Sequence, residues 1–490
     1  MELIKRALAR AFTRFEAVFE YAFGQSNTPF AWLGALGWYF YWIVAATGIY
    51  LYIFFDTGIT DAYASVEYMT HDQWYAAGVM RSLHRYASDA LVVVVVLHIF
   101  REFAFDRLRG RRFFAWLTGV PLLAFIYLCG ISGYWLVWDQ LAQYIAVATT
   151  EWLDTLPLFG EPIANNFLNS MTLGGRFFTL MVFIHIFGPL FMLLLMWVHI
   201  QRHSQAKVNP PRPLAIGTLA VLVVLSLVFP AISQGPADLD VVPTELGFDW
   251  FYLAVYPLLD VVPGGQLWLY LFAGFLMLAL LPWMPPARRV PAAAVNLDNC
   301  NGCTRCFDDC PFGAISMVPR SDGRAYDSEP IVNANQCTSC GICAGACPTS
   351  MPFRRSGPLQ AGIELPHRSI AKLREELLEG AQEARVLVFA CDTCDTTELG
   401  RGGAKVIRLP CVGMLPPSFV DFALARHHAA GVMIAGCAEG DCHHRLGNEW
   451  TIERMARRRD PYLRQRVDER RLCLSWLPQG SARRRQRALA

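Results

Sequence analysis

The sequence is short of charge. Only 17% of its 490 residues are charged and 54% are hydrophobic, whereas about 25% of residues are charged in average soluble domains. This shortage argues against a wholly soluble protein. The net charge of +2 says little by itself, because it averages two unlike halves of the chain. The length predicts two to four domains.

Charge is scarcest before residue 286. Five runs there contain no Asp, Glu, Lys or Arg: Ala31–Phe55, Phe113–Val137, Phe177–Ile200, Leu214–Ser233 and Gly264–Pro285. Each has the roughly 20 residues that a helix needs to cross a bilayer, and Val79–Phe100 is a sixth candidate with polar residues at its entry. The first 30 residues lack the short apolar core and cleavage site of a signal peptide, so we expect an amphipathic surface helix there.

The segments between these runs alternate in the sign of their charge. The basic ones contain Lys5, Arg6, Arg10 and Arg14, then Arg101, Arg107, Arg109, Arg111 and Arg112, then Arg202, Lys207 and Arg212, and finally Arg288 and Arg289. The others are acidic, with Asp56, Asp61, Glu67 and Asp72, then Asp139, Glu151, Asp154 and Glu161, and then Asp238, Asp240, Glu245, Asp249 and Asp260. The positive-inside rule therefore predicts six spans, with the N-terminus and everything after Pro285 in the cytoplasm.

Two of the apolar segments carry histidines at the same interval. His84 and His98 are fourteen residues apart, and so are His185 and His199. On a helix this interval is nearly four turns, so both rings of a pair lie on one face about 21 Å apart. Because the two spans run in the same direction, His84 is level with His185, and His98 with His199. Two stacked bis-histidine sites are expected, and neutral imidazole is a usual ligand of haem iron.

Glycines repeat the interval. Gly34 and Gly48 are fourteen residues apart on the first span, and Gly119 and Gly133 on the third. Glycine allows a bulky partner to approach a helix backbone, which two macrocycles stacked in a four-helix bundle would need. The alternative is that these residues mediate ordinary helix packing. Covalent haem is not expected, because Cys-x-x-Cys-His does not occur.

Residues 78–200 resemble the cytochrome b of bc-type complexes, especially the b-type subunit of the photosynthetic complex. The matching pieces are RSLHRYAS, LHIFRE, WLTGV, GYWLVWDQ and HIFGP. The resemblance implies that His84, His98, His185 and His199 bind two b haems. It also implies that Arg81 and Arg85 meet haem propionates.

The family's Pro-Glu-Trp-Tyr motif is missing. The nearest stretch is FDWFYLAVYP at 248–257, with Asp249 in place of the glutamate, and no Rieske-type motif occurs. A bifurcating quinol site of the usual kind is therefore not expected, but a quinone site is. Its candidate groups are His203, one turn beyond His199, together with Asp139 and Asp249. His203 could equally be a solvated residue at a helix end.

Eight of the 15 cysteines lie in two runs after residue 299, CNGCTRCFDDCP and CTSCGICAGACP. Both read C-x2-C-x2-C-x3-C-P, which is typical of two-cluster bacterial ferredoxins, where the fourth cysteine of a run ligates the other cluster. We expect two 4Fe-4S clusters, one held by Cys300, Cys303, Cys306 and Cys347, and the other by Cys337, Cys340, Cys343 and Cys310. Zinc is the alternative metal.

Five further cysteines follow strand-like segments: Cys391, Cys394, Cys411, Cys437 and Cys442. Strands alternate here with helices, which predicts a small parallel α/β domain. Ligands bind at the ends of the strands in such folds, so these cysteines are expected to converge. Cys129 and Cys473 stand apart from both groups.

This last segment resembles the iron–sulfur delta subunit of methyl-viologen-reducing hydrogenases. The shared features are CxxC, a lone Cys before Val-Gly, and GCAEGDCHHRLGN. The resemblance implies a 2Fe-2S cluster on four of the five cysteines and a flavin- and cluster-bearing partner. His443 and His444 are candidate hydrogen-bond donors beside it. A docking domain with zinc or a disulfide is the alternative.

These patterns predict a membrane-embedded all-α bundle of about six spans with a dihaem four-helix core, then a two-cluster ferredoxin domain and a small α/β domain. The expected parts are the N-terminal helix at 1–30, the membrane domain at 31–285, a linker at 286–296, the ferredoxin domain at 297–356 and the hydrogenase-delta-like domain at 366–490. The linker would keep the first cluster near the inner haem. The setting is the cytoplasmic membrane of a bacterium or archaeon.

The order of cofactors predicts an electron wire between a quinone pool and a soluble redox enzyme. No nucleotide-binding glycine motif or nucleophile triad is present, so the substrate-oxidising site is expected on a partner. Candidate partners are flavin and iron–sulfur subunits of the heterodisulfide-reductase type, a hydrogenase, or a formate or NAD(P)H dehydrogenase; a homodimer is left open, and no nucleic acid is expected. Two alternatives stay open: a haem-bearing anchor or redox sensor, and transmembrane electron transfer without quinone.

Overall fold

The computed structural model describes residues 2–24, 27–109, 112–158, 175–201, 208–284, 290–354, 358–394, 403–425, 428–438 and 441–477, with the single positions 162, 396 and 399. It divides into two compact units. The helical unit comprises Leu33–Phe103 and Arg112–Met284. The cysteine-rich unit comprises Met1–Trp32, Ala104–Arg111 and Pro285–Ala490.

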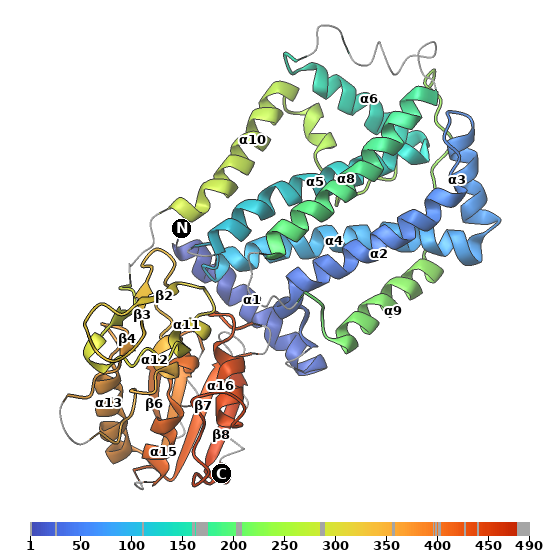
Figure 1. Ribbon diagram of the computed structural model, residues 1–490. Coiled ribbons are helices and arrows are strands. Elements are labelled where there is room, and N and C mark those ends of the chain that lie inside the picture. The colour runs from blue at the N-terminus through green and yellow to red at the C-terminus, as the bar shows by residue number, and fades with distance from the viewer. Residues whose placement is uncertain are drawn as a thin grey trace. The chain divides into compact units, whose positions relative to one another are not determined.

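Four long helices run alongside one another in the helical unit (Figure 1). They are α2 (Leu33–Phe54), α4 (Val79–Ala104), α5 (Phe113–Val137) and α8 (Gly175–Gln201). α2 and α5 contain no charged residue, so neither has a polar face that demands water. α5 packs directly against α8. This arrangement is the four-helix core that the sequence predicts.

Among the residues that the structure describes, four segments are long and apolar enough to cross a bilayer: Pro29–Phe54, Phe113–Val137, Phe178–Gln201 and Gly264–Trp283. They make this an integral membrane protein. α4 has 26 residues and the length to span, but it carries charged residues. α9 (Arg212–Val228) is apolar and has 17 residues. The count of six spans therefore stays a prediction.

Shorter elements join the long helices. They are α3 (Asp61–His71), a π-helix at Trp74–Gly78, α6 (Gln140–Asp154), a 3-10 helix at Tyr256–Asp260, and α10 (Gly264–Leu280), which ends in a 3-10 turn at Leu281–Trp283. α5 stops where Trp138 adopts a left-handed conformation (φ 51°). α6 begins two residues later, because the Asp139 side chain accepts a 2.9 Å hydrogen bond from the Ala142 N–H and so caps it.

The cysteine-rich unit opens with the 22-residue helix α1 (Glu2–Phe23). Its exposed apolar side chains include Leu3, Ile4, Phe15, Val18, Tyr21 and Phe23, as an interfacial helix requires.

Two small antiparallel sheets frame the paired cysteine runs. β1 (Ala294–Val295) pairs with β4 (Ile363–Glu364), and β2 (Ile315–Pro319) pairs with β3 (Ser328–Val332). Two single-turn helices, α11 (Arg305–Asp308) and α12 (Ile342–Ala346), lie within the runs. Each follows a residue with positive φ, which turns the chain sharply between two cysteines. The ferredoxin-like domain is thus present.

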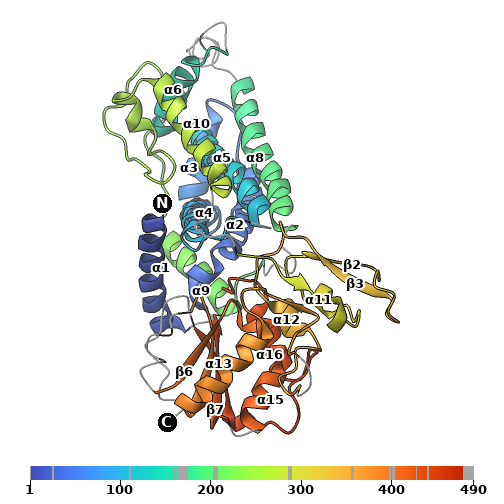
Figure 2. The ribbon, with the colours of Figure 1, turned by 90° about the vertical axis from the view of Figure 1, so that its left-hand side faces the viewer.

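The C-terminal part is a four-stranded parallel sheet with strand order β6-β5-β7-β8. The strands are β5 (Val386–Cys391), β6 (Lys405–Leu409), β7 (Gly431–Cys437) and β8 (Leu472–Leu477). α13 (Ile370–Glu383) packs on β5 and β6, and α15 (Pro417–Ala425) packs on β7; Figure 2 shows these helices and α16 (Gly447–Met455) from a second side. The predicted parallel α/β domain is confirmed.

Candidate redox-cofactor sites

The four bundle histidines form two pairs across α4 and α8. The rings of His84 and His185 have centroids 6.3 Å apart and planes inclined by 61°. His98 and His199 are close enough to interact electrostatically. The equal spacing on two helices therefore produces two facing pairs, one above the other.

The separation of the first pair matches two ligands of one metal ion. A histidine nitrogen binds a metal at about 2 Å, and the ring centre lies about 1 Å further out. Two imidazoles on opposite sides of one ion therefore have centroids about 6 Å apart. The observed 6.3 Å leaves room for an iron atom between the rings, so the pair fits a bis-histidine haem.

A shared hydrogen-bond pattern orients three of these rings. In each, Nδ1 faces a backbone carbonyl and a hydroxyl on the neighbouring helix. The groups are the Val44 carbonyl (3.0 Å) and Thr47 (3.1 Å) for His84, the Cys129 carbonyl (3.0 Å) and Ser132 (3.1 Å) for His185, and the Ala115 carbonyl and Thr118 (3.1 Å) for His199. A neutral imidazole that donates a hydrogen bond through Nδ1 has a free electron pair on Nε2. This is the tautomer that can bind iron through Nε2.

The glycines sit opposite the histidines. A Cβ on Gly48 would lie 3.0 Å from His84 Cε1, and one on Gly133 would lie 2.9 Å from His185 Cε1. A Cβ on Gly34 would lie 3.5 Å from His98 Cε1, and one on Gly119 would lie 3.5 Å from His199 Cε1. These glycines therefore make room for the histidine rings. Room for a macrocycle, which the sequence suggests, stays a prediction.

The three hydroxyls were not expected from the sequence, although a signal is present. Thr47, Thr118 and Ser132 each come directly before one of the interval glycines, while Leu33 precedes Gly34. The carbonyls bonded to Nδ1 come from the residue four positions before the same glycine. For each of the three rings, one helical turn therefore supplies a carbonyl, a hydroxyl and the space left by a glycine.

The two arginines assigned by resemblance contact protein groups. Arg81 donates to Ser233 Oγ at 2.8 Å and to the Thr70 hydroxyl. Arg85 lies 3.2 Å from both Asp89 and Asp249. Their role toward haem propionates stays a prediction.

Asp249 is the centre of a buried polar cluster. Its carboxylate accepts hydrogen bonds from the Tyr134 hydroxyl and from the Phe251 N–H, the latter at 2.9 Å. The Arg85 guanidinium also lies 4.6 Å above the Tyr134 ring. A carboxylate is thus held beside a cation and a hydroxyl in the interior of the helical unit; its part in a quinone site stays a prediction.

Asp139 has a structural task. One carboxylate oxygen caps α6, and the other accepts a 2.9 Å hydrogen bond from the Gln234 N–H. Both oxygens therefore hold backbone in place. His203 lies outside the described residues, so its part in a quinone site stays a prediction.

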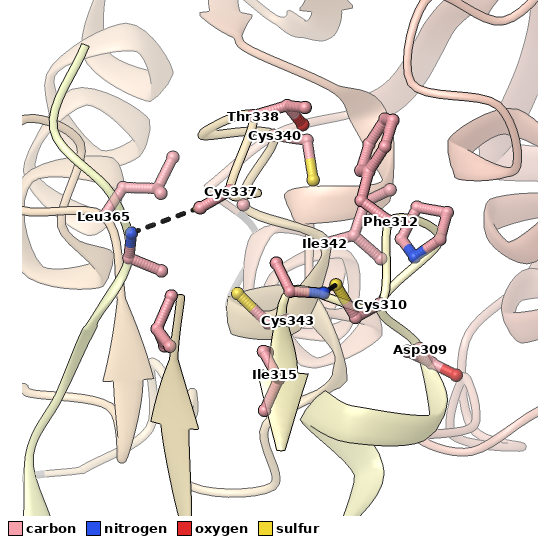
Figure 3. A pocket seen from close by; sticks show the side chains of 15 residues that line it. Asp309, Cys310, Phe312, Ile315, Cys337, Thr338, Cys340, Ile342, Cys343 and Leu365 are labelled. Atoms are coloured by element: carbon pink, nitrogen blue, oxygen red, sulfur yellow. Dashed lines mark hydrogen bonds between the residues drawn. The ribbon is translucent and has the colours of Figure 1, made fainter. Parts of the chain in front are cut away.

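Each predicted set of four ferredoxin cysteines surrounds its own cavity. One cavity is lined by Cys300, Cys303, Cys306 and Cys347. The other is lined by Cys310, Cys337, Cys340 and Cys343, as Figure 3 shows. The fourth cysteine of each run thus crosses to the opposite run.

The cavity surroundings suit thiolate-bound clusters. The Ala314 N–H donates to Cys310 Sγ at 3.2 Å, and the Ser339 and Ala293 N–H groups donate to Cys337 Sγ at 3.5 Å; such donors set cluster potentials. Burial raises the pKa of the Cys306 and Cys340 thiols to about 12. Without a metal these thiols keep their protons, so loading iron must release them.

The five C-terminal cysteines form one buried group. The sulfurs of Cys391, Cys394 and Cys437 lie within 4.8 Å of one another. Sulfur contacts extend from Cys391 to Cys411 and from Cys437 to Cys442, and a further one joins Cys411 to Cys442. Cys391 and Cys437 end the two central strands, so the parallel sheet brings them together.

The remaining candidates lie beside these groups. His444 faces Thr338 Oγ1 at 3.5 Å and meets the Phe312 ring edge-on, so it borders the second ferredoxin cavity. Cys473 lies on β8 opposite Met433 of β7. Cys129 contributes its carbonyl to the His185 site.

Paired imidazoles in a bundle and cysteine-lined cavities define a membrane protein built for electron transfer. Comparison with known families agrees. Residues 23–206 match cytochrome b/b6/petB, residues 299–351 match the 4Fe-4S dicluster domain, and residues 386–490 match the delta subunit of methyl-viologen-reducing hydrogenase. The three resemblances are confirmed, and the chain is a membrane electron-transfer subunit of a redox complex.

One similar solved structure is titled "Hyperthermophilic respiratory Complex III". It shares 20% sequence identity with the chain and has a TM-score of 0.43, and the match covers 51% of this chain and 74% of the other. Both values are low, so the proposals below rest on the family matches and the site geometry.

Proposed function

We propose that this protein carries electrons between a membrane quinone pool and a soluble redox enzyme, through two b haems and cytoplasmic iron–sulfur clusters. The observation that carries the proposal is the 6.3 Å spacing of His84 and His185, repeated in sequence by His98 and His199. Haem supplies one-electron chemistry when bound. The protein's part is to present Nε2 of each ring, which the Nδ1 hydrogen bonds support.

The cysteines would extend the path into the cytoplasm. Cys300, Cys303, Cys306 and Cys347 would hold one 4Fe-4S cluster, and Cys310, Cys337, Cys340 and Cys343 the other. Their support is that each set lines one cavity. Four of the five C-terminal cysteines would hold a 2Fe-2S cluster. Cys391 and Cys437 belong to any such set, because each contacts three of the others.

The topology would place the quinone site in the helical unit and the partner in the cytoplasm. Alternating connector charge supports six spans with both termini inside. Asp249 is the best candidate for a proton-accepting group, since Arg85 and Tyr134 hold its carboxylate in a buried cluster. The delta-subunit match supports a partner such as a heterodisulfide-reductase-type flavoprotein, a hydrogenase, or a formate or NAD(P)H dehydrogenase.

The test is reduction of the haems by a quinol in purified full-length protein, followed by b-haem absorbance. We expect quinol to reduce them, a quinone analogue to slow the reaction, and Asp249→Asn to slow it at least tenfold. Asp240→Asn is the control, because that carboxylate is on the same connector and lies near the surface. Haems that dithionite reduces but quinol does not would contradict the quinone link and favour the anchor or sensor alternative.

A further inference from the structure

The second ferredoxin cavity and the C-terminal cysteine group share one apolar core. Phe312, Cys340, Ile342, Cys411, Leu446 and Trp450 form a single buried cluster, and Cys310 packs against it. Cys310 and Cys340 line the second cavity, whereas Cys411 belongs to the C-terminal group. Both domains lie in the cysteine-rich unit, so this contact is internal to one compact body.

Glycines bring the two backbones unusually close. A Cβ on Gly345 of α12 would lie 2.1 Å from the Gly413 carbonyl oxygen, and one on Gly413 would lie 2.9 Å from Ile342 Cγ1. Neither position has room for a side chain. The stretch Val412–Met414 that follows Cys411 is therefore pressed against the α12 turn of the ferredoxin domain.

Ile342 lies at the point of closest approach. Cys411 Sγ, Ile342 Cδ1 and Cys442 Sγ all lie within 3.6 Å of the position that a Gly447 Cβ would occupy. Ile342 is fully buried and stands between Cys340 and Cys343 in the sequence. One buried apolar side chain thus lies between the second set of cysteines and two sulfurs of the C-terminal group.

Three arginines from the C-terminal domain hold the ferredoxin segment Asp309–Phe312. Arg454, which is fully buried, bonds Asp309 and also donates to the Gly413 carbonyl at 2.9 Å. Arg459 donates to the other Asp309 oxygen at 3.0 Å. Arg445 donates to the Pro311 carbonyl at 2.9 Å and lies over the Phe312 ring.

We propose that the cofactor at Cys310, Cys337, Cys340 and Cys343 exchanges single electrons directly with the one at the C-terminal cysteines, across Ile342 and Cys411, and that Arg454 is the positioning residue for this step. The proposal rests on the proposed function. One centre loses the electron that the other gains, so no bond changes and no further reactant is needed. The set at Cys300, Cys303, Cys306 and Cys347 lies off this contact, within the ferredoxin sheets.

Arg454 is suited to the task because one guanidinium reaches both domains. Its two terminal nitrogens hold the residue before Cys310 and the carbonyl two residues after Cys411. Asp309 is shared by Arg454 and Arg459, and Arg459 also pairs with Glu453. The positive charge of Arg454 itself favours the reduced, more negative state of a nearby centre, so its removal should make reduction harder.

The test is electron paramagnetic resonance of the full-length protein, fully reduced with dithionite so that the haems are diamagnetic. Iron content is measured on the same samples. We expect split or broadened signals from two interacting clusters. Cys300→Ser should alter the signal of its own cluster but keep the splitting of the C-terminal centre, whereas Cys340→Ser should lose that splitting. Arg454→Gln is expected to lose the interaction between the clusters and to lower the midpoint potential of the C-terminal centre. Arg454→Lys should retain part of the interaction and show a smaller fall in potential.

Arg466→Gln is the matched control, because Arg466 pairs with the buried Asp421 in the same domain. It should leave the spectrum unchanged. Non-interacting signals at full iron content, or an interaction that Cys300→Ser abolishes, would overturn the proposal. Incomplete iron in the wild-type protein would instead count against the proposed function. If Arg454→Gln fails to retain iron, the wild-type and Cys300→Ser spectra still show whether the two clusters interact.

Discussion

The helical unit and the cysteine-rich unit hold their ligands in opposite ways. In the helical unit, the candidate ligands lie inside long regular helices, and an interval of fourteen residues on α4 and α8 sets the geometry of both histidine pairs. In the cysteine-rich unit, ligands lie on loops, single-turn helices and strand ends, and each site draws on segments far apart in the sequence. A helix fixes positions by its period, whereas the loops depend on the surrounding fold.

This difference determines which single substitutions should disturb a cofactor site most. In the bundle, His84, His185 and His199 each depend on one turn of one neighbouring helix, which supplies a carbonyl, a hydroxyl and a glycine. In the C-terminal group, five sulfurs contact one another, so a change at one position disturbs several.

Loss of a bundle ligand should remove a whole cofactor. We expect His185→Leu to lower the haem content from two per chain to one, because iron loses half of its axial ligands and the partner His84 cannot hold it alone. Pyridine haemochrome analysis measures this directly. His71→Leu is the control, since that ring is exposed and pairs only with Glu67 among the contacts shown. A content of two in His185→Leu would exclude this residue as a ligand.

A single methyl group should dismantle the C-terminal centre. The Cβ of Gly447→Ala would lie 2.1 Å from Cys411 Sγ, so the sulfur must move. We expect loss of the 2Fe-2S signal and of two iron atoms per chain, while the two 4Fe-4S signals persist. In Gly431→Ala the new methyl group meets ordinary contacts at 3.6 Å, and the centre should survive. Equal signals in both variants would contradict the packing described here.

A methyl group in the bundle should have a smaller effect. Gly133→Ala places a Cβ 2.9 Å from the His185 ring, so the ring must shift by a few tenths of an ångström. We expect a reduced haem content, between one and two per chain, and a changed spectrum for the remaining haem at that site. Gly217→Ala in α9 meets nothing within 4 Å and should leave content and spectrum unaltered.

The smallest effect should come from a hydroxyl. Thr118→Val removes an acceptor beside His199 Nδ1 at 3.1 Å, which makes the ring less electron-rich and raises the midpoint potential of its haem. A hydrogen bond contributes roughly 0.5–1.5 kcal/mol, or on the order of tens of millivolts for one electron. Thr218→Val is the control, because that hydroxyl bonds only its own helix at Leu214 and Ala215 in the contacts shown. Potentiometric titration distinguishes the two variants, and a fall in the Thr118→Val potential would refute the explanation.

The sequence predicts the bundle well because its signals are periodic. Uncharged runs mark the long helices, and the interval from His84 to His98 places both rings on one face whatever the details of packing. The same reasoning assigned the glycines to haem clearance, which stays a prediction, and the structure adds that they face the histidine rings. That contact depends on how α2 and α5 rotate against α4 and α8, which no interval within one helix can specify.

The cysteine-rich unit was predictable only to the level of motifs. The doubled run indicated two sets of four cysteines, and the alternation of strands and helices indicated a parallel sheet. The sequence analysis missed β8, because its strand follows a long loop and lies at the edge of the sheet. The roles of Arg454 and Ile342 were not expected either, since each depends on contacts between the ferredoxin-like and C-terminal domains; Arg454 and its partner Asp309, for example, are 145 residues apart.

The most direct test of the account is a combined optical and electron paramagnetic resonance redox titration of the purified full-length protein, with haem and iron counted on the same sample. The account predicts two b-haem transitions, two 4Fe-4S clusters and one 2Fe-2S cluster in one chain. One haem or none would contradict the pairing of histidines on α4 and α8. Two haems without iron–sulfur signals would contradict the cysteine assignments and leave the C-terminal half as a docking module.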